Sequence, residues 1–511
     1  MKTPYYISTP IYYVNGAPHI GHANTSVAAD VLARWKRLDG YDVFFLTRTD
    51  EHGQKVEAAA RDAGLDPQAF TDGVSQQFRD MGDLMGLSND AFIRTTEPRH
   101  HAACQALWTR LVERGEIYLG QYEGWYAVRD EAFYGEEELT TGPGGVRLAP
   151  TGAPVEWVVE PSYFFRLSAW SERLIALYET VPDFIMPDGR RREVMSFVRG
   201  GLTDLSVSRT SFRWGVPVPG DPAHVMYVWV DALTNYITAL GYPNEDTALW
   251  RFWPADRHLV GKDIIRFHSV YWPALLMAAG LDAPRSVFAT GWWTVRGEKM
   301  SKSLGNVVAP AALVETYGLD PVRFFLMREV PMGNDGDFND AALVRRLNTE
   351  LANGLGNLAQ RTLGQISKNL GGVLPDAAEA TEDDAALLAA ARALPEVMRP
   401  MMERMALGDA IEEVWKVIRA ANAYIDHQAP WALKKTDPVR MAAVLRVVVD
   451  VLRVVGVVLQ PVMPGSMGRM LDQIGVGAGE RDLTALDRAL LGGVVLPPPI
   501  GVFPRFNDLA A

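Results

Sequence analysis

Apolar and polar positions near the start of the chain follow two different periods. Segment 5–14, YYISTPIYYV, is rich in aromatic and β-branched residues, which is typical of a buried strand. From Val27 to Leu38 the apolar residues recur at helical spacing and stop before Gly40, which predicts a helix and its end. Segment 41–47, YDVFFLT, predicts a second strand, and 50–64 contains the start of a second helix. This strand–helix–strand order predicts a parallel sheet of the dinucleotide-binding type.

The pattern changes twice further along the chain. Between residues 114 and 224, aromatic residues, glycines and prolines crowd into short alternating runs, which predicts an insertion domain with much β structure. The α/β pattern then resumes, strand-like runs end near residue 340, and helical periodicity continues to about residue 475. We therefore predict an α/β protein: a Rossmann-type parallel-sheet domain in two halves, 1–113 and 225–339, split by an insertion domain, 114–224, and followed by an α-helical bundle, 340–511.

The longest apolar stretch, 441–459, is predicted to be a buried helix of that bundle. Its Arg446, Asp450 and Arg453 are four and three residues apart, so on a helix they form one narrow polar stripe. A membrane span needs about 20 apolar residues with few charges. We therefore expect no association with a membrane.

Composition and charge limit the classes of function without selecting one. Of the 511 residues, 48% are hydrophobic and 22% charged, which is ordinary for a globular protein of several domains. A formal charge of −12 excludes binding of polyanions by bulk positive charge, but a local basic patch remains compatible with nucleic acid. The single cysteine, Cys104, excludes an intramolecular disulfide and a cysteine-based zinc site. With no signal-peptide segment before the first strand, we expect a cytoplasmic protein.

The first candidate motif is PHIGH, residues 18–22, at the junction between the first strand and the first helix. In an open parallel sheet, ligands bind beyond the carboxyl ends of the strands, and a helix N-terminus attracts anions. Gly21 lets a ligand approach the backbone, and His19 and His22 add donors suited to phosphate oxygens. For this pair alone three interpretations stay open: a phosphate site, a helix cap with a core histidine, or part of a metal site.

A second motif, GEKMSKSLGN, occupies residues 297–306. Its Lys299 and Lys302 stand between two glycines, so the segment can form a mobile loop that closes on a polyanion, although a solvated basic turn has the same residues. HIGH followed by KMSKS on an α/β pattern resembles the signature of class I aminoacyl-tRNA synthetases. The segments TPIYYVNGAPHIGH, FFLTRTDEHG, YVWVDALTNY and GKDIIRFHSVYWPA resemble the methionyl-tRNA synthetase family, and this resemblance extends over nearly the whole chain.

The resemblance implies an enzyme that activates L-methionine with ATP and transfers it to tRNA(Met), both initiator and elongator. The reaction needs no covalent enzyme intermediate, so positioning and charge stabilisation would carry the catalysis. The catalytic residues that the resemblance implies are His19, His22, Lys299, Lys302 and Arg209. The implied ATP contacts are His19, Gly21, His22, Asp263 and Lys302. Mg²⁺ is expected together with ATP.

The same resemblance implies a methionine pocket. Asp50, at the end of the second strand, is implied to pair with the substrate ammonium, although the same position could cap a helix. The other implied pocket residues are Ile11, Tyr13, Trp229, Ala232, Leu233, Tyr236 and His268. A flexible thioether suits a slot lined by aromatic rings, since each sulfur–aromatic contact adds about 0.3–1.5 kcal/mol.

The insertion departs from the family in one respect. Many relatives carry paired CxxC motifs that bind zinc there, whereas this chain has Ala127 and Asp130 at the matching positions. Zinc requires about four N, S or O ligands. We therefore expect an insertion domain without zinc, stabilised by packing, and stoichiometric zinc in the purified protein would contradict this.

The resemblance implies that the helical bundle binds the tRNA anticodon. Asn357 and Arg361 are four residues apart on one helix face and, with Trp431, match residues that read the CAU anticodon. Without the resemblance, a solvated helix face and a tryptophan closing an apolar seam describe them equally well. Because the chain stops soon after the bundle, where some relatives continue into a dimerisation domain, we expect a monomer.

Other synthetases of the class and two other functions fit this sequence less well. The leucine, isoleucine and valine enzymes of the class carry an editing insertion larger than 114–224, and the cysteine enzyme needs zinc-binding cysteines. A nucleotidyltransferase that uses HIGH without tRNA is disfavoured by the helical bundle. An inactive tRNA-binding protein is disfavoured because both histidines and both lysines of the two motifs are present.

Overall fold

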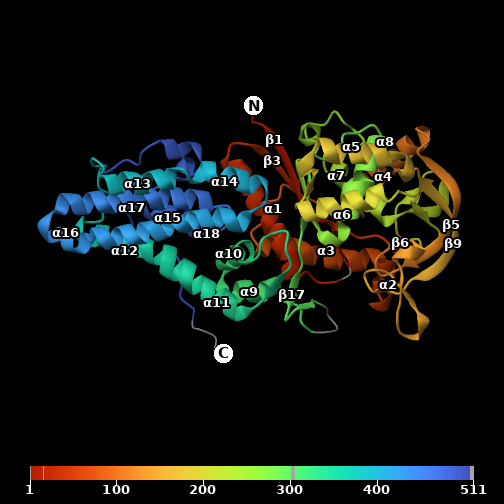
Figure 1. Ribbon diagram of the computed structural model, residues 1–511, viewed down its shortest axis with the longest axis horizontal. Coiled ribbons are helices and arrows are strands. Elements are labelled where there is room, and N and C mark those ends of the chain that lie inside the picture. The colour runs from red at the N-terminus through yellow and green to blue at the C-terminus, as the bar shows by residue number, and fades with distance from the viewer. Residues whose placement is uncertain (1, 15, 301–304, 507–511) are drawn as a thin grey trace.

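The computed structural model describes residues 2–14, 16–300 and 305–506. The molecule is elongated (Figure 1): helices of the C-terminal part lie at one end, and the antiparallel pair β5 (Ile117–Ala127) and β9 (Glu156–Phe165) lies at the other. A parallel sheet lies between these two ends.

The central sheet has the order β10-β16-β15-β1-β3-β2, with β4 also paired to β3, and all its pairs are parallel. The predicted parallel sheet is therefore confirmed. Its strands are β1 (Pro4–Ser8), β2 (Tyr12–Tyr13), β3 (Asp42–Asp50), β4 (Ala91–Arg94), β10 (Ile185–Met186), β15 (Arg257–Gly261) and β16 (Val287–Thr290).

Segment 5–14, predicted as one strand, divides into β1 and β2, and helix α1 (Ile20–Leu38) then leads to β3. Its Val27, Val31 and Trp35 are buried in the core that also contains Ile7 of β1. The helix ends before Gly40, whose φ of 87° suits a residue without a Cβ. The other helices around the sheet are α2 (Gln54–Asp62), α3 (Pro67–Leu84), α4 (Pro98–Glu113), α7 (Val228–Thr238), α8 (Trp272–Ala278), α9 (Pro310–Tyr317) and α10 (Leu319–Glu329).

Residues 114–224 contain small antiparallel sheets but also two helices, α5 (Ser171–Thr180) and α6 (Asp188–Arg199). Each helix buries two residues four apart, Leu174 and Tyr178 in α5 and Val194 and Val198 in α6. β10 lies within the same range and pairs with β16, so the chain re-enters the central sheet there. The other strands are β6 (Ala132–Tyr134), β7 (Thr140–Thr141), β8 (Arg147–Leu148), β11 (Leu205–Ser206), β12 (Ser208–Arg209), β13 (Pro217–Val218) and β14 (Asp221–Met226).

The last named strand in the described part of the chain is β19 (Gly336–Phe338), which pairs with β17 (Trp293–Val295) beside β18 (Glu298–Lys299). Helices follow from there, as expected from the periodicity. They are α11 (Asp340–Arg346), α12 (Asn357–Asn369), α13 (Glu382–Arg392), α14 (Leu394–Glu403), α15 (Leu407–Gln428), α16 (Pro430–Thr436), α17 (Pro438–Leu459) and α18 (Pro464–Gln473).

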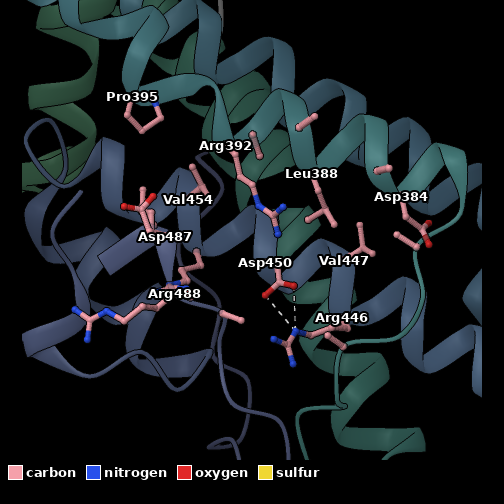
Figure 2. A pocket seen from close by; sticks show the side chains of 18 of the residues that line it. Asp384, Leu388, Arg392, Pro395, Arg446, Val447, Asp450, Val454, Asp487 and Arg488 are labelled. Atoms are coloured by element: carbon pink, nitrogen blue, oxygen red, sulfur yellow. Dashed lines mark hydrogen bonds and ion pairs between the residues drawn. The ribbon is translucent and has the colours of Figure 1, made fainter. Parts of the chain in front are cut away.

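The polar stripe expected on 441–459 lies on α17, where Arg446 and Arg453 are buried and Asp450 is partly exposed. The Nε of Arg446 donates to Asp450 over 3.1 Å, and Arg453 donates to the carbonyl of Ala485 over 2.6 Å. The stripe lines a cavity of about 750 Å³ between α13, α14, α17 and the segment 483–489 (Figure 2). Within the described ranges, none of the helices is both long and apolar enough to cross a membrane.

A buried ion pair fixes the sheet region against the C-terminal helices. Asp30 of α1 accepts from Arg323 of α10 over 2.7 Å, and neither side chain is exposed. Arg323 also donates to the carbonyls of Met85 and Val462, each over 2.9 Å. Burial alone would raise the pKa of Asp30, but the guanidinium groups of Arg323 and Arg34 outweigh burial and hold it below its usual value.

Candidate active site

The two histidines of the first motif form the cap of α1. The Nδ1 of His19 accepts from the backbone N–H of Gly21, and the Nδ1 of His22 accepts from the backbone N–H of His19, both over 3.1 Å. A backbone N–H only donates, so each ring carries its proton on Nε2. Burial, aided by the charge of His19, holds the pKa of His22 well below its usual value. The capping interpretation is thus correct, and the arrangement also places the Nε2–H groups of both rings at the N-terminal end of α1.

The two motifs lie side by side. A Cβ at Gly21 would be 2.9 Å from Cε1 of His19 and 3.9 Å from Cε of Met300, which belongs to the second motif. On the other side of that motif, the carbonyl of Val308 accepts from the N–H of Ile20 at the first turn of α1, over 3.0 Å. The residues on both sides of 301–304 are therefore in contact with the HIGH turn.

The other residues implied to act on ATP are two lysines of the second motif and Asp263. Lys302 lies outside the described residues, and Lys299 is described through its backbone, which pairs with Thr294 of β17. Asp263 lies two residues beyond the carboxyl end of β15 and accepts from the indole N–H of Trp292 over 3.1 Å. Its position is at the edge of the sheet where ligands of parallel sheets bind.

Asp50 is the last residue of β3, where it pairs in register with Tyr13 of β2. It is buried, and its Oδ1 has no hydrogen-bond partner among the described residues. Burial raises the pKa of this carboxyl well above its usual value, and the charges of Asp231 and Glu131 add to the rise. Gly53 occupies the N-cap of α2, so Asp50 does not cap that helix. A buried carboxylate that lacks a cation suits a ligand ammonium.

The implied side-chain pocket contains a cluster of rings. The ring of His268 lies edge-on to Tyr236 and to Trp229, with centroids 5.7 and 6.0 Å apart, and Trp229 stacks on Phe267 at 3.8 Å. Burial lowers the pKa of His268 to about 3, so its imidazole is neutral. Of the other implied lining residues, Ile11 after β1 and Ala232 and Leu233 on α7 are buried, whereas Tyr13 of β2 is partly exposed.

Arg209 does not join this group. Its Nη1 donates to the carbonyl of Ser208 over 2.6 Å, and its guanidinium lies 4.3 Å from the ring centroid of Phe133 and 4.5 Å from that of Tyr227. Its contacts within the described part of the chain include none of the other implied catalytic residues. The Nε and Nη2 of Arg209 are buried and have no hydrogen-bond partner in the described part of the chain.

The implied anticodon residues share one surface at the far end of the bundle. Asn357 and Arg361 lie on α12, and the guanidinium of Arg361 is 5.2 Å from the ring centroid of Trp431 on α16. Arg361 also pairs with Asp426 at 2.5 Å. Trp431 is 41% exposed, so it does not close an apolar seam. An exposed indole beside a guanidinium can stack an unpaired base.

The segment that matches the zinc knuckle of many relatives contains apolar packing. Ala127 is buried with Ala149, Ala153 and Val155 in a small core of their own. Asp130, at the other matching position, accepts from the hydroxyl of Tyr134 over 3.0 Å.

One buried network has no counterpart among the predictions from the sequence. Asp231 of α7 accepts from Nδ1 of His52 over 2.6 Å and from Nε2 of His100 over 2.7 Å. Burial would raise the pKa of Asp231, but the two histidines outweigh it and lower that pKa. The signal was available, since Asp231 is the single charged residue in the apolar run 228–238. Cys104 lies 3.2 Å from Nε2 of His100, so the only cysteine is part of this network.

Two family models match the chain. The model for class I tRNA synthetases (M) matches residues 5–145 and 148–363, and the model for the anticodon binding domain of methionyl tRNA ligase matches residues 374–508. The methionine–tRNA ligase of Mesorhizobium japonicum is 56% identical over 509 residues, which cover 99% of this chain and 98% of the relative. That of Brucella suis is 54% identical, with 99% of each chain covered.

Solved structures give the same result. Mycobacterium tuberculosis methionyl-tRNA synthetase in complex with methionyl-adenylate has a TM-score of 0.96 to this chain at 52% identity, covering 98% of this chain and 100% of that one. Its free form has a TM-score of 0.89 at 49% identity, covering 99% of each chain. The chain therefore belongs to the methionyl-tRNA synthetases, a family of class I tRNA synthetases.

Proposed function

We propose that the chain activates L-methionine with ATP to methionyl-adenylate and then transfers methionine to the 3′ end of tRNA(Met), initiator and elongator alike. The observation that carries this proposal is the contact between the two motifs. Met300 approaches Gly21, and Val308 bonds to Ile20, so groups of both motifs can reach one triphosphate at the N-terminus of α1.

In the first step the methionine carboxylate oxygen bonds to the α-phosphorus of ATP while the bond to the bridging oxygen of pyrophosphate breaks. The Nε2–H groups of His19 and His22 would donate to the phosphate oxygens as charge develops on pyrophosphate. Lys302 and Lys299 would add cations from the second motif, and Asp263 would contact the nucleotide. Arg209, whose Nε and Nη2 lack hydrogen-bond partners among the described residues, would add a further cation.

The amino acid would be held by its ammonium and its side chain. Asp50 offers an unpaired carboxylate oxygen to the ammonium, and Trp229, Tyr236 and His268 supply the rings around the thioether. ATP would enter as its Mg²⁺ complex, because Mg²⁺ is commonly carried by substrate phosphates with one or two carboxylates. No zinc is needed for this scheme.

The anticodon would be read by Asn357, Arg361 and Trp431, with Lys434 and Lys435 of α16 near the phosphates. The division into domains at 1–113, 114–224, 225–339 and 340–511 stays a prediction. The same holds for a monomeric state and for a place in the cytoplasm.

Methionine-dependent ATP–pyrophosphate exchange, measured with and without tRNA, tests the proposal. We expect exchange with methionine in the absence of tRNA, and charging of tRNA(Met) when it is added. Exchange with another amino acid would identify a different class I synthetase. Nucleotidyl transfer that ignores methionine and tRNA would identify a nucleotidyltransferase.

A further inference from the structure

Arg48 is a buried cation that has no ion-pair partner among residues 2–14, 16–300 and 305–506. It lies in β3 two residues before Asp50, so both side chains leave the same face of the sheet. The residue is 0% exposed, and none of its three guanidinium nitrogens has a hydrogen-bond partner in the described part of the chain. The contact described for the guanidinium is with the ring of Tyr236, whose centroid lies 3.7 Å from Cζ.

The groups around Arg48 also have polar atoms without partners. The hydroxyl of Tyr236, Nε2 of His258 and Nε2 of His268 are buried and lack hydrogen-bond partners among the described residues. Ring centroids place His258 3.7 Å and His268 5.7 Å from Tyr236. The charge of Arg48 contributes, after burial, to lowering the pKa of both imidazoles. These four residues therefore form one buried polar cluster.

This cluster is energetically unfavourable as it stands. A desolvated guanidinium needs an acceptor, and contact with one aromatic ring offsets only part of the loss of water. Buried polar groups in native proteins normally have partners, so an unpaired set indicates a missing water, ion or ligand. Two members of the cluster, Tyr236 and His268, also line the proposed methionine pocket.

We propose that Arg48 is a specificity-determining residue of the amino-acid pocket. Through Arg48 the pocket favours amino acids whose side chain is unbranched and has a hydrogen-bond acceptor at the position of the thioether. This inference rests on the proposed function, because it assumes that the pocket takes methionine. The thioether sulfur is a weak acceptor and a polarizable atom. A ligand with a methylene in place of the sulfur would leave the guanidinium unpaired, so Arg48 would discriminate against it.

The test compares L-methionine with L-norleucine, which has a methylene in place of sulfur, in ATP–pyrophosphate exchange. The variant Arg48→Met keeps an unbranched side chain over Tyr236 but removes every donor. We expect the ratio of kcat/KM for methionine to kcat/KM for norleucine to fall about five- to ten-fold, through the KM of methionine. The KM of ATP should stay unchanged.

Arg251→Met is the matched control. Arg251 is an exposed arginine whose guanidinium lies 4.5 Å from the ring centroid of Phe252, and its variant should keep the wild-type ratio. A folded Arg48→Met with an unchanged ratio would overturn the inference, because a water or a purely structural contact would then explain the cluster.

If Arg48→Met does not fold, Arg48→Lys decides. This variant keeps the charge and three donors but loses the planar guanidinium. The logarithm of the methionine-to-norleucine ratio of kcat/KM should therefore fall by about half as much as in Arg48→Met. A wild-type ratio in Arg48→Lys would overturn the inference in that case. Failure of the wild-type chain to use methionine at all would instead overturn the proposed function.

Discussion

Replacing Trp431 by alanine should weaken recognition of tRNA and leave the two small substrates unaffected. Stacking of one base on an aromatic ring is worth about 1–3 kcal/mol. A factor of ten corresponds to about 1.4 kcal/mol, so KM for tRNA(Met) should rise about 5- to 150-fold. Since the indole is 41% exposed and lies beside the guanidinium of Arg361, the loss of stability should be small. The KM values of ATP and methionine should not change, because α16 lies at the far end of the bundle (Figure 1).

Aminoacylation at varied tRNA concentration measures the KM for tRNA(Met), and pyrophosphate exchange measures the KM values of ATP and methionine. Trp157→Ala is the matched control: Trp157 is 51% exposed, lies on β9 at the opposite end of the molecule and packs edge-on to Trp125. Equal increases in all three KM values would refute the anticodon role of Trp431. A rise in KM for tRNA with Trp157→Ala as large as that with Trp431→Ala would do the same.

Three further predictions concern catalysis, substrate binding and stability. His22→Asn should lower kcat of pyrophosphate exchange about 100- to 1000-fold, since it removes an Nε2–H donor, and a change below about ten-fold would contradict that role. Burial raises the pKa of Asp50, and only the ionised carboxylate pairs with an ammonium. The KM of methionine should therefore rise on acidification at a higher pH than the one at which an ordinary aspartate titrates. Asp50→Asn should have a high KM for methionine that does not depend on pH in this way. Arg323→Met should lower the free energy of unfolding in urea by about 3–5 kcal/mol, because Asp30 keeps a buried charge without a partner, and a loss below about 1 kcal/mol would show that the pair does not stabilise the fold.

Local signals in the sequence were sufficient for the main elements. The apolar period of α1 and its end before Gly40, the parallel sheet and the helical C-terminal part all follow from residues close together in the chain. Turn chemistry and helical spacing act over a few positions, so a sequence expresses them directly. The two motifs were recognisable for the same reason, since each is a short run at one strand–helix turn or one loop.

Tertiary structure decided which distant residues share a buried site. Asp231 bonds to His52, 179 residues away, and to His100, 131 residues away, and no local pattern links these three positions. No local pattern predicts the contact between Arg48 and the ring of Tyr236 either. Nor does one predict that β10, within the predicted insertion, pairs with β16 of the central sheet. The sequence by itself determined the main elements outside 114–224, their order and the motifs, whereas helices α5 and α6 within that range were not predicted. Only the fold decided the partners and the burial of the charged groups, because both depend on how separate segments pack against one another rather than on neighbours along the chain.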